Sequence, residues 1–315
     1  MDRIVAWHFT DPACPWAYSS RPAIARVRWR FGDQLDWRLV VIGLSETTDR
    51  YEAAGYTPAR MTAGHRKFEQ RFGMPFGSGV KERMAPSSRA CRAIVAAREE
   101  SMEMGYAALR AIQLMQFTTP GLLDDDEHLR EALEDVDGLD AAAVVARIDD
   151  PAIVAIYDED KARTRSAEGR PTHVQNRHSE ADGPVRYTAP SVIFEVPDGR
   201  WLEVGGFQPF ESYDNALANL DPTLERRPAP ERAADAVLAF PVGLTTAEVA
   251  SIMRPSDLED ADRHATEREL IAAVDAGELV MQPMGTDALW RPAEVTWASL
   301  ARTQGSEARG AHSGA

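Results

Sequence analysis

The segment Asp11-Pro12-Ala13-Cys14-Pro15-Trp16-Ala17-Tyr18 joins a predicted strand to a predicted helix and carries one of the two cysteines of the chain. Residues 3–9 before it alternate and are rich in β-formers, which predicts a strand. Residues 19–31 after it place apolar side chains at helical spacing, and Gly32 follows as a C-cap. A second strand is predicted over residues 36–42. The chain therefore opens with a βαβ unit whose first turn holds Cys14.

This position bears on the chemistry of Cys14. The N-terminus of a helix presents free N–H groups and a partial positive charge, which stabilise a thiolate. We therefore expect the pKa of Cys14 to lie below that of a free cysteine. Such a thiolate would attack a disulfide or an electrophile. Pro15 suits the first helical turn, and Trp16 would form an apolar surface beside the sulfur. An inert buried cysteine at a strand end is the alternative.

Residues 57–181 show a helical pattern, and strands return only after them. Two strands are predicted at 191–196 and 200–204, joined by a hairpin at Pro197-Asp198-Gly199, with a helix near 209–219. From the residues alone, the chain is an α/β protein with a helical block. The helices predicted within that block cover 58–72, 86–104, 105–117, 125–135, 139–148 and 150–166.

Three segments resemble the DsbA/FrnE family in the order in which the family carries them. The turn at Cys14 resembles its active-site segment, Cys-Pro-Trp-Cys-Tyr. Tyr187-Thr188-Ala189-Pro190-Ser191 resembles the cis-proline loop, and Gly205-Gly206-Phe207-Gln208-Pro209 resembles the turn before the last helix. The resemblance covers about residues 1–220. It implies a thioredoxin fold with a helical insertion, shared with 2-hydroxychromene-2-carboxylate isomerases and kappa-class glutathione transferases.

The resemblance also implies the site. Cys14 matches the attacking cysteine, and Pro190 matches the cis-proline that packs against its sulfur. The backbone of Ala189 would pair with an extended peptide or a thiol cofactor. From the residues alone, Pro190 is a trans proline that starts an edge strand. The candidate substrate- or cofactor-binding residues are Pro15, Trp16, Ala17 and Ala189.

One position departs from the family, because Ala17 stands where the second, resolving cysteine is expected. The second thiol would then come from a small thiol such as glutathione or mycothiol, or from Cys91. A third route is isomerase or transferase chemistry on a thiol conjugate. Cys91 itself is typical of a packed helix cysteine, and a resolving role needs the two Cα atoms within about 7 Å.

The leading hypothesis is a monothiol DsbA-like oxidoreductase that uses Cys14 as a thiolate nucleophile. The first alternative is a thiol-dependent transferase or isomerase acting on a small electrophilic compound. The second alternative is a non-catalytic thioredoxin-fold scaffold or interaction protein. The implied partners are a small thiol or a protein or peptide disulfide, and a homodimer stays open.

Composition excludes several other classes of function. A net charge of −15 argues against binding nucleic acid. No apolar run is long enough to span a membrane, and the N-terminus lacks a signal-peptide pattern, so we expect a cytoplasmic protein. Two cysteines without a nearby histidine predict no metal site, and no nucleotide-binding motif occurs. We expect no tightly bound cofactor.

Several other residues are candidates for roles in substrate binding or in helix capping. Arg83, Arg89 and Arg92 would hold a carboxylate of a thiol cofactor or substrate, or form surface salt bridges instead. His8 precedes the turn and either approaches the site or packs as a strand histidine. Ser87 and Ser88 are predicted to cap one helix, and the acids at 124–127 to start another as a solvated cap.

The chain is predicted to contain more than the thioredoxin-like domain of residues 1–221. Residues 222–232 hold several prolines and read as a linker. Residues 233–300 resemble a winged helix, and residues 301–315 are predicted to be disordered. The candidate recognition helix is acidic, which favours a packing or protein-contact module over DNA binding; a helical extension of the main core is equally compatible. The module is assigned helices at 245–253 and 266–276 and hairpin strands at 278–283 and 287–291.

Overall fold

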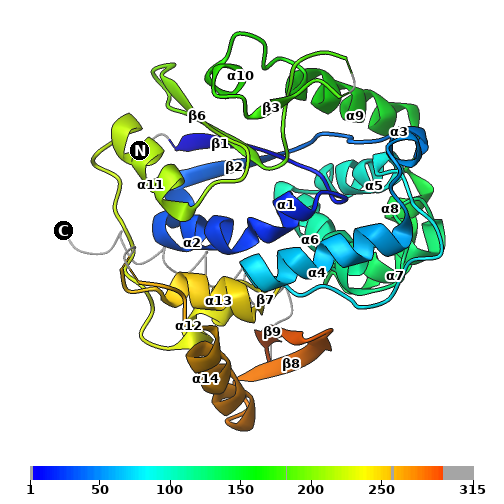
Figure 1. Ribbon diagram of the computed structural model, residues 1–315. Helices are drawn as coiled ribbons and strands as arrows, with labels where there is room; N and C mark the ends of the chain where they lie inside the picture. The colour runs from blue at the N-terminus through cyan, green and yellow to red at the C-terminus, as the bar shows by residue number, and fades with distance from the viewer. Residues whose placement is uncertain (1–2, 182, 257–258, 294–315) are drawn as a thin grey trace.

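The computed structural model describes residues 3–181, 183–256 and 259–293. Its centre is a four-stranded sheet in the order β2-β1-β5-β6 (Figure 1). β1 pairs parallel with β2 and antiparallel with β5, and β6 continues the sheet antiparallel to β5. The α/β class and the position of the helical insertion between β2 and β5 are as predicted. The strands are β1 (Ile4–Thr10), β2 (Leu35–Val41), β5 (Ser191–Glu195) and β6 (Trp201–Gly205).

Two helices, α1 (Pro15–Ser19) and α2 (Arg21–Phe31), connect β1 to β2 where one helix was predicted. They meet at Ser20, and Pro22 begins α2 without a backbone N–H to continue the first helix. α2 buries apolar side chains against the sheet, and α11 (Phe210–Leu220) packs beside it. This face of the sheet forms one apolar core, while α9 and α10 lie on the opposite side (Figure 1).

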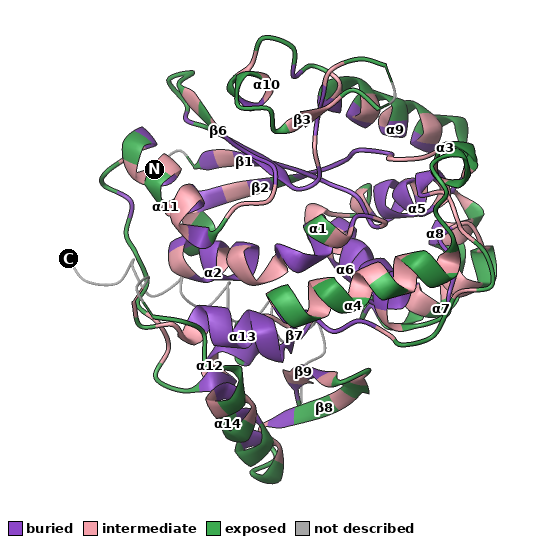
Figure 2. Cartoon of the chain, in the orientation of Figure 1, coloured by how far each residue is buried: buried purple, intermediate pink, exposed green. Residues whose placement is uncertain are grey.

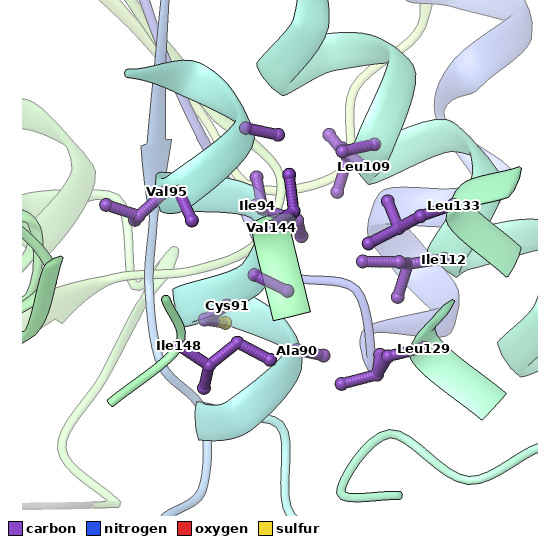
Figure 3. Close-up of a cluster of buried hydrophobic side chains, with 14 of the residues drawn as sticks. Ala90, Cys91, Ile94, Val95, Leu109, Ile112, Leu129, Leu133, Val144 and Ile148 are labelled. Carbon is purple, nitrogen blue, oxygen red and sulfur yellow. The ribbon is translucent and has the colours of Figure 1, made fainter. Parts of the chain in front are cut away.

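The helical insertion packs mainly against one end of the sheet, and its central cluster contains Cys91 (Figure 3). The predicted helix over 86–104 is wrong as a single element. It stops at Arg98, and the hydroxyl of Ser101 accepts the N–H of Met104 to begin the next helix. The helices are α3 (Asp49–Ala53), α4 (Pro58–Phe72), α5 (Ser88–Arg98), α6 (Met102–Thr118), α7 (Asp126–Glu134), α8 (Ala141–Ala146), α9 (Pro151–Thr164) and α10 (Pro171–Val174).

Two details of the insertion bear on the site. The α4 helix lies against α1 and has no fully buried residue, as its outer colouring shows (Figure 2). After α10, a short ribbon of β3 (His178–Ser179) and β4 (Arg186–Tyr187) leads into the loop before β5. The ribbon therefore positions the loop that carries Pro190.

The C-terminal unit contains the predicted helices and hairpin around the three-stranded sheet β7-β9-β8. Its α13 packs on α2, and Glu248 of α13 accepts hydrogen bonds from Arg110 at 2.8 and 2.7 Å and from Arg21 at 3.1 Å. This buried ion triad joins the unit to α2 and α6. The predicted tail at 301–315 lies outside the described residues. The elements are α12 (Ala233–Leu238), β7 (Leu244–Thr245), α13 (Thr246–Met253), α14 (Arg263–Asp275), β8 (Leu279–Met284) and β9 (Asp287–Pro292).

The length and apolar character of the helices bear on whether any of them could cross a bilayer. Among residues 3–181, 183–256 and 259–293, no helix combines the length and apolar character needed to cross a membrane.

Candidate functional site

Cys14 is the N-cap residue of α1, at the end of a turn built by Asp11. The Cys14 N–H donates to the Asp11 carbonyl at 3.2 Å, and the Ala13 N–H donates to the Asp11 carboxylate at 2.9 Å. An Asp followed by Pro favours such a turn, because its side chain bonds the backbone two residues on. The turn leaves 7% of Cys14 exposed, so this residue is buried.

The loop before β5 supplies the other half of the site. The Cys14 thiol donates to the carbonyl oxygen of Ala189, with Sγ and O 3.3 Å apart. The Ala189–Pro190 peptide bond is cis, which confirms the conformation implied by the family resemblance. Because β1 and β5 are neighbours in the sheet, the strand ends next to Cys14 and Ala189 lie at the same end of the sheet. The structure thus brings together Cys14, Ala189 and Pro190.

The expected direction of the Cys14 pKa is wrong. Burial, with a smaller contribution from the nearby Asp11 carboxylate, raises the pKa of the Cys14 thiol to about 12. The backbone N–H groups of Ala17 and Trp16 and the charge of Arg186 lower it by less. The helix N-terminus stabilises a thiolate, but the loss of water around the buried sulfur disfavours the charged form by more. Cys14 is therefore a protonated thiol in this state.

Asp11 is a buried residue whose side chain the sequence argument overlooked. One carboxylate oxygen, Oδ2, accepts hydrogen bonds from the Leu44 N–H at 2.9 Å, the Ser87 hydroxyl at 3.2 Å and the Cys91 thiol at 3.4 Å. Burial raises the pKa of Asp11 despite these donors. Ser87 is the N-cap residue of α5, as predicted, but its hydroxyl makes no cap hydrogen bond and donates to Asp11 instead.

Cys91 is completely buried in the cluster of α5 and its neighbouring helices (Figure 3). Burial and the adjacent Asp11 carboxylate raise the pKa of Cys91 well above its ordinary value. Cys14 and Cys91 are both free thiols and contact different groups, the Ala189 carbonyl and the Asp11 carboxylate. Cys91 is thus a packed helix cysteine, as the sequence pattern around it predicted.

An aromatic group surrounds the exposed side chain of Trp16 beside the turn. Trp16 is 42% exposed, and its ring lies 4.7 Å from Phe68, 5.7 Å from Phe72 and 5.4 Å from Phe207. We call these four residues the aromatic rim. Ala17, by contrast, is buried and packs in the same apolar cluster as Cys14. The rim joins α1, α4 and the turn after β6 next to the thiol.

The three arginines predicted to hold a carboxylate already form ion pairs with acidic residues of the protein. Arg83 donates to Asp124 at 2.7 Å, and Arg92 donates to Asp149 at 2.8 Å. Arg89 donates to Asp149 at 2.9 Å and also to Asp126. These guanidinium groups form surface ion pairs, so the carboxylate-holding role is not supported. The acids at 124–127 do start a helix, since the Asp125 carboxylate accepts the N–H groups of Glu127 and His128.

One group of side chains has the composition of a metal site. Among the described residues, His173, His178 and Glu180 place one ligand atom each within 4.8 Å of one another. The Gly169 N–H donates to Nδ1 of His173 at 3.0 Å, so the neutral ring carries its proton on Nε2. That nitrogen then lacks the lone pair that a metal needs, and the set does not fit an ion as arranged.

Comparisons with known proteins bear on the family and the fold. Residues 7–188 match the family model described as the DSBA-like thioredoxin domain. No curated protein matches the chain.

Solved structures also resemble part of the chain. A candidate protein disulfide isomerase from Nitrosomonas europaea is 14% identical and covers 69% of this chain and 97% of its own, with a TM-score of 0.53. The cytosolic disulfide reductase DsbM from Pseudomonas aeruginosa, also solved with GSH, is 21% identical and covers 69% and 98%, with a TM-score of 0.48. The first of these likenesses supports the fold.

Proposed function

This chain belongs to the family of DSBA-like thioredoxin domains, and we propose that it is a monothiol thiol–disulfide oxidoreductase whose nucleophile is Cys14. The observation that carries the proposal is the contact between the Cys14 thiol and the Ala189 carbonyl beside the cis Pro190. Ala17 removes the second sulfur from the motif, so each cycle needs a thiol from elsewhere.

The first step forms a mixed disulfide. A substrate disulfide pairs with the backbone at Ala189, and the Cys14 sulfur bonds to one of its two sulfurs. The substrate S–S bond breaks, and the departing sulfur takes the proton from the Cys14 thiol. Negative charge on the Cys14 sulfur during attack is stabilised by the N–H groups of Ala17 and Trp16 and by Arg186.

The second step breaks the mixed disulfide and restores the free thiol of Cys14. A small thiol attacks the substrate sulfur of the mixed disulfide, forms a new S–S bond with it, and returns Cys14 to the thiol form with its proton. The net reaction exchanges one thiol of the substrate disulfide for the small thiol, without gain or loss of electrons. Glutathione and mycothiol are the proposed co-substrates. A cytosol, where such thiols are abundant and reduced, is the proposed compartment.

The small thiol is preferred over Cys91 as the resolving group. Cys91 has no exposed surface, and its thiol is bonded to the Asp11 carboxylate inside the α5 cluster. Attack by Cys91 would require it to leave that cluster and become a thiolate next to a carboxylate, which both burial and charge oppose.

The proposed substrates are protein or peptide disulfides. The aromatic rim offers exposed apolar surface next to the thiol, which suits side chains that flank a substrate cysteine. The transferase or isomerase alternative calls for a deep cavity that reaches the sulfur. A cavity of about 980 Å³ next to α1 is lined by Ala17 but not by Cys14 or Pro190, which favours the oxidoreductase.

Mass spectrometry of the intact protein tests the proposal. After incubation with a glutathionylated peptide, the wild type should carry one mixed disulfide on Cys14, and added glutathione should remove it with turnover. Cys91→Ala should behave like the wild type, while Cys14→Ala should form no adduct. A Cys14→Ala variant with undiminished exchange would contradict the proposal and support a scaffold. Loss of turnover in Cys91→Ala would instead assign the resolving role to that cysteine.

A further inference from the structure

An exposed arginine lies beside the loop that carries the cis proline. The N–H of Arg177 donates to the Thr172 carbonyl at 2.9 Å, and its carbonyl accepts the Thr188 hydroxyl at 2.8 Å. Asn176 before it has a φ of 55°, a left-handed conformation that asparagine tolerates better than most residues. The backbone of Arg177 is therefore fixed against the loop that positions Ala189.

The side chain of Arg177 lies over the turn after β6. A Cβ atom at Gly206 would lie 3.6 Å from Cβ of Arg177 and 3.6 Å from the hydroxyl oxygen of Thr188. Phe207 of the aromatic rim follows Gly206 in the chain. Arg177 is exposed, and no described residue forms an ion pair or a hydrogen bond with its guanidinium. Its charge is therefore available to a substrate beside both the cis-proline loop and the rim.

The α4 helix carries further positive charge on the other side of the rim. It has one acidic residue, Glu69, and four basic residues, namely Arg60, Arg66, Lys67 and Arg71, which give it a net charge of +3. The Glu69 carboxylate accepts the hydroxyl of Thr286 at 2.6 Å. Arg66, Lys67 and Arg71 are exposed (Figure 2) and form no ion pair within the part of the chain that the structure describes. We call these three residues the basic face of α4.

Aromatic contacts connect the two positive groups. The ring centroids of Phe72 and Phe207 are 4.7 Å apart, and the guanidinium carbon of Arg71 lies 5.1 Å from the Phe72 centroid. Arg177 contacts the residue that precedes Phe207. Arg71 and Arg177 therefore flank the same pair of rings, and both rings contact Trp16 next to the thiol.

Acidic residues of the neighbouring elements carry less charge than these basic groups. The α3 helix has Asp49 and Glu52 but also Arg50, which leaves a net charge of −1. Glu180 after β3 adds one negative charge, and the buried Glu203 forms an ion pair within the protein. Acids farther away are screened beyond about 8 Å at physiological ionic strength. The surface around the rim is therefore positive although the whole protein has a net charge of −15.

We propose that the thiol site selects disulfides in acidic peptide segments, and that Arg177 and the basic face of α4 make this selection. The inference rests on the proposed function, because it names the substrate class of the same site. The peptide backbone pairs at Ala189, and an apolar side chain packs on the rim. Carboxylates on either side of the substrate cysteine pair with Arg177 and Arg71. Such charges act mainly on the rate of encounter and on the choice among peptides.

The rate at which Cys14 forms a mixed disulfide tests the selection. Three peptides of one length carry cysteine next to phenylalanine, flanked by glutamates, glutamines or lysines. Each is used as its mixed disulfide with 2-mercaptoethanol, which adds no charge. Mass spectrometry of the intact protein should show the glutamate peptide reacting about tenfold faster than the lysine peptide at physiological salt, with the glutamine peptide between them. This preference should shrink at about 1 M salt.

Charge reversal assigns the preference to the named residues. Arg177→Glu should lower the ratio of the glutamate-peptide rate to the lysine-peptide rate about tenfold, and the double variant Arg66→Glu/Lys67→Glu should lower it in the same direction. Arg268→Glu, at an exposed position of α14, is the matched control and should keep the wild-type ratio. Equal rates for the two peptides in the wild type would overturn the proposal. An unchanged ratio in both variants, with circular dichroism that matches the wild type, would also overturn it.

Binding without reaction separates this inference from the proposed chemistry. Cys14→Ala protein should bind fluorescein-labelled peptides that carry serine in place of cysteine in the same order, as fluorescence anisotropy would measure. That order, without any adduct on Cys14 of the wild type, would support the charge selection and contradict the oxidoreductase. Adducts that form at equal rates with all three peptides would contradict the selection and support the oxidoreductase.

Discussion

At the scale of single residues, Asp11 and Cys14 occupy one buried turn, and each is disfavoured in its charged form. Burial raises the pKa of both side chains, and each charge would raise the pKa of the other. The turn is therefore most stable when at least one of the two groups is protonated. This electrostatic coupling gives two measurable consequences.

The first concerns the reactivity of Cys14 in the absence of substrate. A rise in pKa from 9.0 to about 12 lowers the thiolate fraction at mildly alkaline pH about a thousandfold. We expect folded Cys91→Ala protein to react with iodoacetamide at least that much more slowly than the same protein in denaturant. The alkylation rate should still be rising at pH 10. Equal rates in the folded and unfolded protein would show that burial does not raise the pKa of Cys14.

The second concerns the pH dependence of stability. The pKa of Asp11 is raised from 3.8 by burial, so folding favours its protonated form. Its contribution to the free energy of unfolding is complete below pH 3.8 and is lost as the pH rises through the folded-state pKa. In urea titrations, the wild type should therefore lose stability relative to Asp11→Asn as the pH rises above 3.8. Asp158→Asn, at an exposed position, is the control. A difference that stays constant over this range would contradict the assignment.

At the scale of elements, α1 carries the departure that determines the chemistry. Ala17 is one helical turn beyond Cys14 and packs in the same cluster. Ala17→Cys should therefore form a disulfide with Cys14, since the family motif has that spacing and the adjacent cavity leaves room for a sulfur. After equilibration with oxidised glutathione, the variant should lose two thiols without an adduct, while the wild type gains a mixed disulfide. Persistent glutathione adducts on Ala17→Cys would show that the helix geometry prevents closure.

The sequence predicted some elements well and others poorly, for physical reasons. The turn at Cys14 is a local motif, so the strand–turn–helix pattern predicts it, whereas the cis bond at Pro190 was implied only by the family resemblance, since the residues alone favour a trans proline. The break between α5 and α6 was missed because apolar residues continue through Met102, while the cap at Ser101 is one hydrogen bond. The pKa of Cys14 was wrong because burial depends on α4, β5 and the insertion packing around the turn. Distant contacts of this kind leave no local pattern.

At the scale of the whole molecule, Glu248 joins three parts of the chain. Burial raises the pKa of Glu248, but Arg110 and Arg21 outweigh burial and lower it from 4.5 to about 2. The ion triad therefore contributes about 3 kcal/mol above pH 4.5, and this contribution is lost as the pH falls towards 2. Glu248→Gln should lower the free energy of unfolding by about that amount at neutral pH, as urea titration would measure.

The control for this prediction is an exposed ion pair in the same unit. Glu278 pairs with Arg232 at the surface, and Glu278→Gln should change the free energy of unfolding by less than about 1 kcal/mol. The stability difference between the wild type and Glu248→Gln should narrow as the pH falls below 4.5. A Glu248→Gln variant as stable as the wild type at neutral pH would contradict the prediction. It would show that the attraction within the triad only offsets the free-energy cost of removing its charges from water.

The position of β1 between β2 and β5 also has a consequence for how the protein is made. During translation, β1 and β2 leave the ribosome early, but their sheet has an open edge until residues 191–195 follow. Arg21 and Arg110 lack their ion-pair partner for still longer, because Glu248 is synthesised after both. The nascent chain thus exposes an incomplete sheet and unpaired guanidinium groups during most of its synthesis. A chaperone that binds apolar, basic segments would find its target in this interval.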